Sequence, residues 1–177
     1  MTTYTIRHAA PEDIPAIHRM TVAGIHIWGA DILDNLKPWM DRECTPEFIL
    51  GKVLSPDYEF FVAESSDGVI VGTVNINTVT NHLYGMYCEV RGKGVGTALA
   101  SRVVKVAEAY RMEDIKTEVI YGNWPASGLA EKYGAVLVGN KLDAGVNYVI
   151  RCPIMLSNTL LRHRIDSFQP NPIAIKL

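Results

Sequence analysis

The sequence predicts a single domain of the α/β (α+β) class, and three observations lead to that class. The chain has 177 residues, which is enough for one domain with a substantial hydrophobic core. Hydrophobic residues make up 48% of it and charged residues 20%, as in ordinary globular proteins. Patterns typical of strands and helices follow one another in the order strand, two helices, three strands, helix, strand, helix, two strands.

The N-terminal part of the chain is predicted to contain a strand and a helix. Residues 3–9 alternate between apolar and polar side chains, as in a short strand. Pro11-Glu12-Asp13 then places a proline and two acidic residues where a helix N-terminus favours them. Apolar residues follow at helical spacing as far as Ile25, so we expect the first helix there.

A second helix is predicted after an irregular segment. Residues 27–43 include Gly29 and Pro38, so this segment is predicted to be a loop or a broken helix. Thr45-Pro46-Glu47 supplies an N-cap residue and a proline at the first helical position. The helix that begins there is expected to end near Leu54, because a Ser-Pro pair follows.

The central part of the chain is predicted to form three strands. Residues 60–64 and 69–76 are rich in β-branched and aromatic side chains, and the Asp-Gly pair within 65–68 favours a tight hairpin between them. Leu83 to Cys88 form the third strand. The elements expected after it are a long helix ending near Arg111, a strand at 115–120, a helix at 125–133 and a strand pair at 136–138 and 146–150.

A glycine-rich turn separates the third of these strands from the long helix. It runs Arg91-Gly92-Lys93-Gly94-Val95-Gly96-Thr97, with glycine at every second position and two cationic side chains. Glycine lets the backbone bend so that successive N–H groups converge, and the helix that follows directs its positive end to the same point. The turn therefore predicts a cradle for a phosphate or pyrophosphate group. The alternative is a glycine-rich turn that binds no ligand.

The spacing of the glycines decides which phosphate ligand is expected. A dinucleotide fingerprint requires glycine at position 97, which is Thr97, and a P-loop requires glycine at position 87, which is Tyr87. Both nucleotide motifs are therefore excluded. The remaining pattern, Arg-x-x-Gly-x-Gly between a strand and a long helix, resembles the acyl-CoA signature of the GNAT acetyltransferase superfamily.

The resemblance to GNAT acetyltransferases covers roughly residues 3–153, because the order of the predicted elements is also the order found in that family. It implies a central twisted sheet, mixed but largely antiparallel, of about six to seven strands flanked by about four helices. We therefore expect an acetyltransferase domain at 1–153 and a C-terminal tail of unknown role at 154–177. The tail could pack on the domain or on a second copy of the chain, so a homodimer is one alternative.

The family resemblance also implies the cofactor, acetyl-CoA, and the residues that bind it. In the family, the strand before the glycine turn exposes backbone N–H groups to the pantetheine arm and to the thioester carbonyl. Asn123 matches the asparagine that binds the pantetheine or phosphate arm, and it can serve as a helix N-cap as well. The cofactor-binding residues expected on this basis are Met86, Tyr87, Cys88, Arg91, Gly92, Lys93, Gly94, Val95, Gly96, Thr97 and Asn123.

Acetyl transfer to an amine requires a base, because an alkyl amine with a pKa near ~10.4 is protonated at neutral pH. Glu118 is the candidate, since Glu118-Val119 followed by Asn123 resembles the Glu-Val-x-x-x-Asn stretch of N-terminal and ribosomal-protein acetyltransferases, where that Glu is the base. A charged residue within an apolar strand also requires an explanation of its own. The alternative is that Lys116 and Glu118 share the solvent face of an edge strand.

The proton donor to the leaving thiolate is not assigned by the resemblance. Most relatives carry a tyrosine where this chain has Ala130. Tyr133, nearly one helical turn later, is one candidate catalytic residue, although it is also a reasonable packing residue before a glycine. Tyr121, Tyr84 and Tyr148 are other phenols that could reach the site.

Composition and motif content argue against several other functions. The net charge of −2 gives no reason to expect a nucleic-acid partner, and no apolar run approaches the length of a membrane span. The N-terminus shows no signal-peptide pattern, so a cytoplasmic location is predicted. The five His and three Cys residues lack metal-ligand spacing, so no metal is predicted. Cys88 lies near the glycine turn, where a core residue is favoured over a nucleophile.

The acceptor is expected to enter from the side opposite the coenzyme, near residues 25–43 and 141–147. The first segment could hold a cationic acceptor between aromatic and acidic side chains, or it could be an exposed acidic loop. The aromatic and acidic residues concerned are Trp28, Asp31, Asp34, Trp39, Asp41 and Glu43.

The function predicted from these features is N-acetyl transfer from acetyl-CoA to a small primary amine or an amino acid, by direct transfer in a ternary complex. Two alternatives remain open. One is a peptide or protein acetyltransferase acting on an N-terminus or a lysine. The other, from a different class, is a non-catalytic acyl-CoA-binding sensor or interaction protein.

Overall fold

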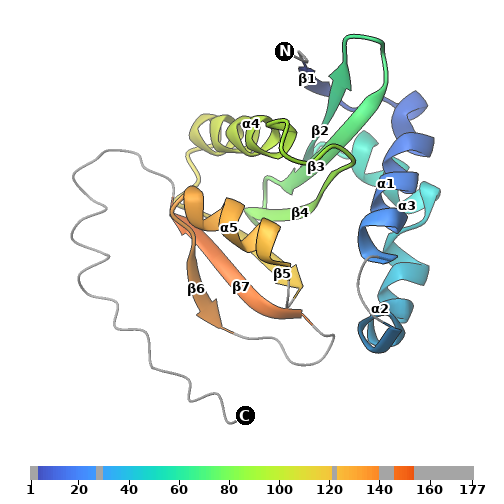
Figure 1. Cartoon of the computed structure of the whole chain (residues 1–177). Coiled ribbons are helices and arrows are strands. Elements are labelled where there is room, and N and C mark those ends of the chain that lie inside the picture. Colours follow the sequence, from blue (N-terminus) through green and yellow to red (C-terminus); the bar gives the residue numbers. More distant parts are fainter. Residues whose placement is uncertain (1–3, 27–29, 121–122, 140–145, 154–177) are drawn as a thin grey trace.

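The computed structural model describes residues 4–26, 30–120, 123–139 and 146–153, and these form one sheet with helices on both faces (Figure 1). The described sheet has seven strands in the order β1-β2-β3-β4-β5-β7-β6. All neighbours are antiparallel except β4 and β5, so the mixed, largely antiparallel sheet is confirmed. The strands are β1 (Tyr4–His8), β2 (Tyr58–Ser65), β3 (Ile70–Asn77), β4 (His82–Cys88), β5 (Asp114–Ile120), β6 (Val136–Gly139) and β7 (Val146–Pro153).

The helices cover both faces of this sheet. In Figure 1, α4 and α5 lie on one face, and α1 and α3 lie on the other. In the described part of the chain, no helix is both long enough and apolar enough to cross a membrane. The helices are the 3-10 turn η1 (Pro11–Asp13), α1 (Ile14–His26), α2 (Ala30–Glu43), α3 (Pro46–Leu54), α4 (Val95–Ala109) and α5 (Trp124–Lys132).

Helix α2 corrects one sequence-based prediction. Residues 27–43 are predicted to be a loop or a broken helix, but residues 30–43 form a helix with Pro38 inside it, which raises the number of flanking α-helices from about four to five in the described chain. Proline removes one helical hydrogen bond. The helix nevertheless continues past it, because the N–H of Cys44 donates to the carbonyl of Met40 over 3.0 Å. Contacts of α2 with α3 outweigh the local breaker signal.

Two hydrophobic clusters fill the space on either side of the sheet. The first lies between the sheet and α4 and includes Phe61, Leu99 and Val103, each no more than 1% exposed. The second lies between the sheet, α1 and α3 and includes Ile17 and Phe60. Because both faces are covered, β2 and β3 are buried along most of their length, and a polar side chain inside them requires a partner or a function.

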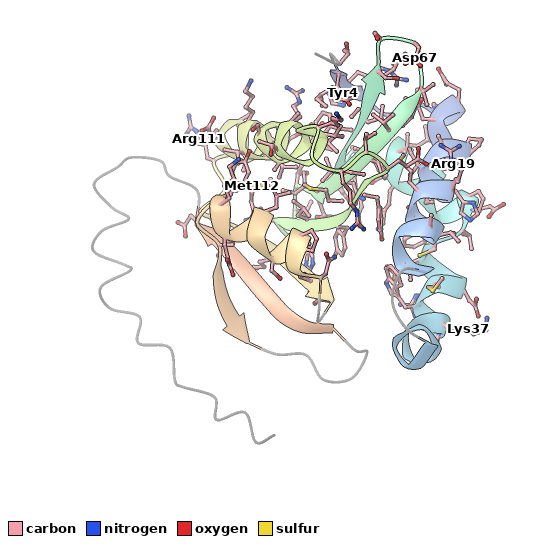
Figure 2. All side chains as sticks on the ribbon, in the orientation of Figure 1. Tyr4, Arg19, Lys37, Asp67, Arg111 and Met112 are labelled. Atoms are coloured by element: carbon pink, nitrogen blue, oxygen red, sulfur yellow. The ribbon has the colours of Figure 1, made fainter. Side chains whose placement is uncertain are left out.

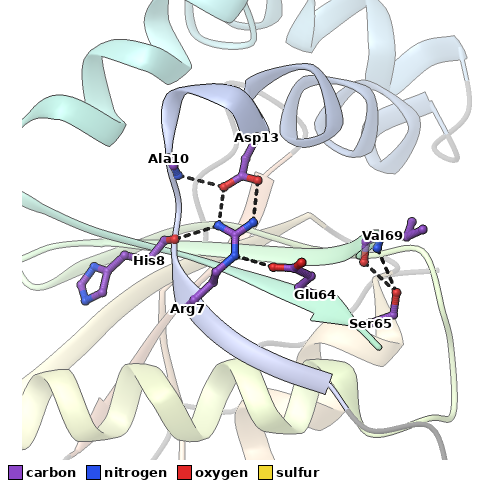
Figure 3. Close-up of polar contacts among 7 residues, drawn as sticks. All are labelled: Arg7, His8, Ala10, Asp13, Glu64, Ser65 and Val69. Atoms are coloured by element: carbon purple, nitrogen blue, oxygen red, sulfur yellow. Dashed lines mark hydrogen bonds and ion pairs between the residues drawn. The ribbon is translucent and has the colours of Figure 1, made fainter. Parts of the chain in front are cut away.

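A cluster of charges fastens β1 to β2 and to the start of α1 (Figure 3). The Arg7 guanidinium donates to both carboxylate oxygens of Asp13, at 2.7 and 2.9 Å, and its Nε donates to Glu64. Asp13 is 5% exposed and also accepts from the backbone N–H of Ala10. Its hydrogen bonds to Arg7 hold the pKa of Asp13 below its usual value. Every charge in this cluster has a partner, so its role is structural.

Candidate active site

The sheet splits between β4 and β5. The two strands pair only at His82 with Lys116 and at Leu83 with Thr117. Beyond that point β4 stays on β3 as far as Cys88, whereas β5 stays on β7. Figure 1 shows the resulting two parts, β1–β4 and β5–β7, diverging from each other. The edge of β4 is therefore unpaired by β5 along the stretch that the family resemblance assigns to pantetheine.

The backbone of β4 directs polar groups into this split. The N–H of Glu89 donates to Val71 on β3 over 3.0 Å, so Tyr87, two residues earlier, also faces β3. Strand alternation then directs the N–H group of Cys88 to the side that β5 has left. A bulge that comprises Gly85, with φ +52°, and Met86 interrupts the register with β3 just before Tyr87.

The predicted phosphate cradle lies at the end of the same strand. Gly92 and Gly94 have φ of +69° and +84°, a region that favours glycine. A Cβ atom added to either would meet nothing within 4 Å, so backbone conformation rather than crowding requires glycine here. Residues 91–94 are exposed, and α4 begins at Val95. The first N–H groups of that helix lack partners within it and point toward the turn.

Helix α5 meets the start of α4 and the end of β4. A Cβ atom on Gly96 would lie 3.5 Å from Leu129 and 3.7 Å from the Sγ of Cys88. The side chain of Asn123 accepts from the N–H of Ala126 over 3.2 Å and so caps α5, which leaves its amide N–H₂ for another partner. Burial raises the pKa of the Cys88 thiol to about 11, so this thiol is neutral at physiological pH.

Tyr133 joins α5 to α4. Its hydroxyl lies 2.7 Å from the Oγ of Ser101 and donates to the carbonyl oxygen of Thr97 over 3.0 Å. The phenolic proton is therefore engaged by the backbone of the first turn of α4. These contacts are those of a residue that docks one helix on another.

Glu118 and Tyr84 flank the point where the sheet opens. They are the first positions beyond the last β4–β5 pair, Leu83 with Thr117. Leu83 packs on the α4 side, so strand alternation puts Tyr84 on the opposite face, and the parallel register puts Glu118 there too. Burial, followed by the charges of Tyr58, Glu43 and Glu118, raises the pKa of Tyr84. Glu118 is half-buried, and β5 is not an edge strand of the sheet, although at this position it pairs with β7 alone because its pairing with β4 ends at Thr117.

A small cavity of about 60 Å³ adjoins this face of the split. It lies between β3 and β4 on one side and α1, α2 and α3 on the other. The tip of Lys52 and the buried amide of Asn75 are among its polar groups, and both are absent from the sequence-based prediction. The cavity is lined by Ile17, Thr21, Trp39, Glu43, Cys44, Ile49, Lys52, Phe60, Thr73, Asn75, Tyr84, Gly85 and Tyr87.

The predicted acceptor segments are only partly assembled at this cavity. Trp39 and Glu43 line it, whereas Asp41 is exposed and pairs with Lys37 over 3.0 Å. Figure 2 shows Lys37 at the outer side of α2. Trp28 and residues 141–145 lie outside the described residues, and so does Tyr121. The side chains of Asp31, Asp34 and Tyr148 are likewise outside the described part.

A signal for the two overlooked residues is present in the sequence. Asn75 lies within the apolar run Val69 to Ile76, where a polar side chain is costly unless it has a use. Lys52 follows Phe48 by four residues on a helix whose other charged residue, Glu47, lies in the first turn. Local sequence patterns do not show that α3 packs against β3 and β4, and this packing brings both residues to one cavity.

A sheet opened between two parallel strands, beside a glycine cradle at a helix N-terminus, is the architecture of an acyltransferase. Residues 27–135 match the model of the acetyltransferase (GNAT) family, so the chain belongs to that family. This confirms the family resemblance, the acyltransferase class and acetyl-CoA as the acyl donor that the family uses.

Solved structures agree with this fold. The chain is similar to the PaiA N-acetyltransferase from Thermoplasma acidophilum in complex with coenzyme A, with a TM-score of 0.70 and 17% identity over 85% of this chain and 99% of that one. The chain is also similar to the ribosomal-protein-S18-alanine N-acetyltransferase from Escherichia coli, with a TM-score of 0.66 and 15% identity over 89% of this chain and 97% of that one. For YncA from Salmonella typhimurium, solved with its cofactor acetyl-CoA, the TM-score is 0.63 and the identity is 19%, over 86% of this chain and 94% of that one.

Proposed function

We propose that this protein transfers an acetyl group from acetyl-CoA to the primary amine of a small molecule or an amino acid, by direct transfer in a ternary complex. One observation carries the proposal. The split between β4 and β5 has the glycine cradle at one end and, on the face of α1 and α3, a carboxylate and a mainly apolar cavity that contains a few polar groups. A donor and an acceptor can therefore approach the same gap from two sides.

The residues at the cradle suit the phosphates of coenzyme A. The exposed turn carries Arg91 and Lys93, and the left-handed Gly92 and Gly94 leave room above the first N–H groups of α4. The N–H groups of Met86 and Cys88 would bind the pantetheine arm and the thioester carbonyl. The Asn123 amide would bind the same arm while its oxygen caps α5. When bound, acetyl-CoA supplies an acetyl group activated as a thioester.

Glu118 is proposed as the general base. It lies on the acceptor face, one position beyond the last β4–β5 pair, where a carboxylate can take a proton from an incoming ammonium group directly or through a water molecule. A covalent route through Cys88 is disfavoured, since burial raises the pKa of its thiol to about 11 and keeps it a poor nucleophile. Direct transfer to the amine follows from these two points.

The proton donor to the thiolate is proposed among the phenols of the site. Tyr133 is the candidate from the sequence, but its hydroxyl is held by Thr97 and Ser101, which favours a packing role. Tyr84 stands at the mouth of the split beside Glu118, and its phenol is protonated at neutral pH, as a tyrosine ordinarily is. Tyr84 is therefore the better candidate of the two.

The proposal is tested by measuring coenzyme A thiol release from acetyl-CoA with free amino acids, polyamines, aminoglycosides and short peptides as acceptors. Coenzyme A binding is measured beside it by calorimetry. Turnover with small amines or amino acids supports the proposal. Turnover confined to peptides would move the function to a peptide or protein acetyltransferase. Coenzyme binding without turnover on any acceptor would support a sensor instead.

A further inference from the structure

The cavity beside the split contains a cation, the ammonium of Lys52, for which the described residues provide no ion-pair partner. The ammonium of Lys52 lies 4.6 Å from the ring centroid of Tyr84, 4.8 Å from that of Phe48 and 5.4 Å from that of Tyr58. These aromatic faces attract a cation without neutralising it. Among the described residues no carboxylate forms an ion pair with Lys52.

The carboxylate that lines the same cavity is already engaged. Glu43 lines the same cavity, but its Oε1 pairs with the Arg42 guanidinium over 2.6 Å. Burial lowers the pKa of Lys52, and the charge of Glu43 only partly offsets this effect. A buried ammonium in this state gains free energy from any anion that enters the cavity.

A second polar group in the cavity is also unpaired. Asn75 is 5% exposed, and within the part of the chain that the structure describes its Oδ1 accepts no hydrogen bond. The neighbouring polar side chains differ from it, because Thr73 donates to Phe61 and Thr21 donates to Ile17. Buried amide oxygens are nearly always paired in native proteins, so an orphan beside a cavity points to a ligand that donates an N–H.

Both unpaired groups adjoin Tyr84. The Lys52 ammonium lies over its ring, and Asn75 is its partner in the β3–β4 register. Tyr84 in turn stands beside Glu118 at the mouth of the split. An unpaired cation and an unpaired acceptor in one small cavity are complementary to a ligand that carries an anion and an N–H donor close together.

We infer that the cavity recognises an amino-carboxylate acceptor, with its carboxylate on the Lys52 ammonium and its amine N–H on the Oδ1 of Asn75. This inference rests on the proposed function and narrows its substrate class to free amino acids and close analogues. One ammonium suits a monoanion such as a carboxylate, whereas a phosphate dianion would call for more cations than the cavity has. The volume of about 60 Å³ fits a headgroup and not a bulky acceptor.

Kinetics with matched acceptors test the inference. The acceptors are the free amino acids, their carboxamides and the amines left by removing the carboxyl group. For the wild-type protein we expect a preference of about 10- to 100-fold in kcat/KM for the carboxylates, as a charge-assisted hydrogen bond supports. Lys52→Met is expected to raise KM for the carboxylates by the same factor, with kcat within about threefold, and to leave the carboxamides unchanged.

Two further variants separate recognition from general damage. Lys37→Met removes a lysine of α2 whose side chain is 69% exposed, and it should leave all acceptors unchanged. Asn75→Leu fills the same space without the amide oxygen and should raise KM for carboxylates and carboxamides alike, because both keep the amine. The inference is overturned if the wild type does not prefer carboxylates, or if Lys52→Met improves polyamines, which would make the aromatic rings a site for cationic acceptors.

A binding measurement keeps the inference distinct from the proposed function. If no acceptor is acetylated, the proposed function fails, but amino-acid binding to the coenzyme A complex can still be measured by calorimetry. Binding that weakens by about 10-fold or more in Lys52→Met, and not in Lys37→Met, supports the cavity as an amino-carboxylate site. Equal binding by the three proteins, or none by the wild type, overturns it.

Discussion

Two half-buried cations, Arg7 and Lys52, are treated very differently by this fold. The guanidinium of Arg7 donates hydrogen bonds to the carboxylates of both Asp13 and Glu64, so its charge is paired. The Lys52 ammonium lies over three aromatic rings, and the Oδ1 of Asn75, which lines the same cavity, has no hydrogen-bond partner among the described residues. A paired buried charge stabilises the region that it joins, whereas an unpaired one costs stability and persists where it serves binding. By this criterion Arg7 belongs to the structural framework and Lys52 to the proposed binding site.

The largest expected effect is on the chemistry of the site. Glu118→Gln should lower kcat by roughly 10²-fold or more, because the amide cannot accept the proton of the acceptor. Coenzyme A binding, measured by calorimetry, and the free energy of unfolding should change little. Glu113→Gln, which alters an exposed carboxylate just before β5, is the matched control and should keep full activity. A fully active Glu118→Gln protein would remove the base from the mechanism.

Breaking the cluster of Arg7, Asp13 and Glu64 should lower the stability of the protein and leave its activity unchanged. Arg7→Met leaves the buried Asp13 carboxylate without its partner and should reduce the free energy of unfolding by about 2–3 kcal/mol, at the low end for buried pairs because Arg7 is 35% exposed. Urea unfolding measures the change, and specific activity at 25 °C should stay near the wild-type value.

Arg19→Met is the control for Arg7→Met. It breaks the pair of Arg19 with Glu89, in which the side chains are 57% and 36% exposed, and should cost at most about 1 kcal/mol. Equal losses in the two variants would mean that the Arg7 cluster is no more than a surface ion pair.

Low pH should remove the contribution of the same cluster to the free energy of unfolding. The pKa of Asp13 lies below its ordinary value of 3.8 in the folded protein, so its contribution is complete above that value and is lost as pH falls through the folded pKa. Asp13→Asn lacks this contribution at every pH. The gap in unfolding free energy between wild type and Asp13→Asn should therefore be largest near pH 6 and narrow below pH ~4. A gap that stays constant to pH ~3 would contradict the assignment.

The smallest expected effect is an increase in the free energy of unfolding, caused by removing the charge of Lys52. Burial lowers the pKa of Lys52 in the folded state, so its charged form costs stability at every pH below that pKa, and the cost vanishes as pH rises toward the ordinary value of 10.5. Lys52→Met should therefore raise the free energy of unfolding at pH 7 by about 1 kcal/mol, with a smaller gain near pH 10. Chemical unfolding at the two pH values measures this. A destabilised Lys52→Met protein would place Lys52 with Arg7 among the structural charges.

The elements outside α2 follow from local patterns that the sequence displays. Thr45 and Pro46 predict the start of α3, and the structure confirms it with a bond of 3.2 Å from the N–H of Phe48 to the hydroxyl of Thr45. The glycines of residues 91–97 predict a bend of the backbone, and in the structure Gly92 and Gly94 both have positive φ. Such features depend on a few consecutive residues, so the sequence contains all that is needed to predict them.

Pro38 and Tyr133 mark where local patterns end. Pro38 predicts a break, yet α2 continues through it because the helix also packs on α3. Tyr133 lies nearly one helical turn after the position of the family's tyrosine and is a candidate catalytic phenol, yet its hydroxyl is bound to Thr97 and Ser101 of another helix. In both cases contacts with a second helix determine the outcome.

The order of the strands and helices and the glycine-rich turn could be predicted from the sequence, because periodicity, caps and turn residues act over short stretches of chain. The acetyltransferase family is predicted from the resemblance of one motif, and the match of residues 27–135 confirms it. Two features depend on the folded chain instead: β4 and β5 part after Leu83, and Lys52 and Asn75 line one cavity. Those two residues come from α3 and β3, and the packing of a helix on a sheet depends on the shape and burial of many side chains at once. The environment that leaves each of them without a partner therefore exists only in the folded protein.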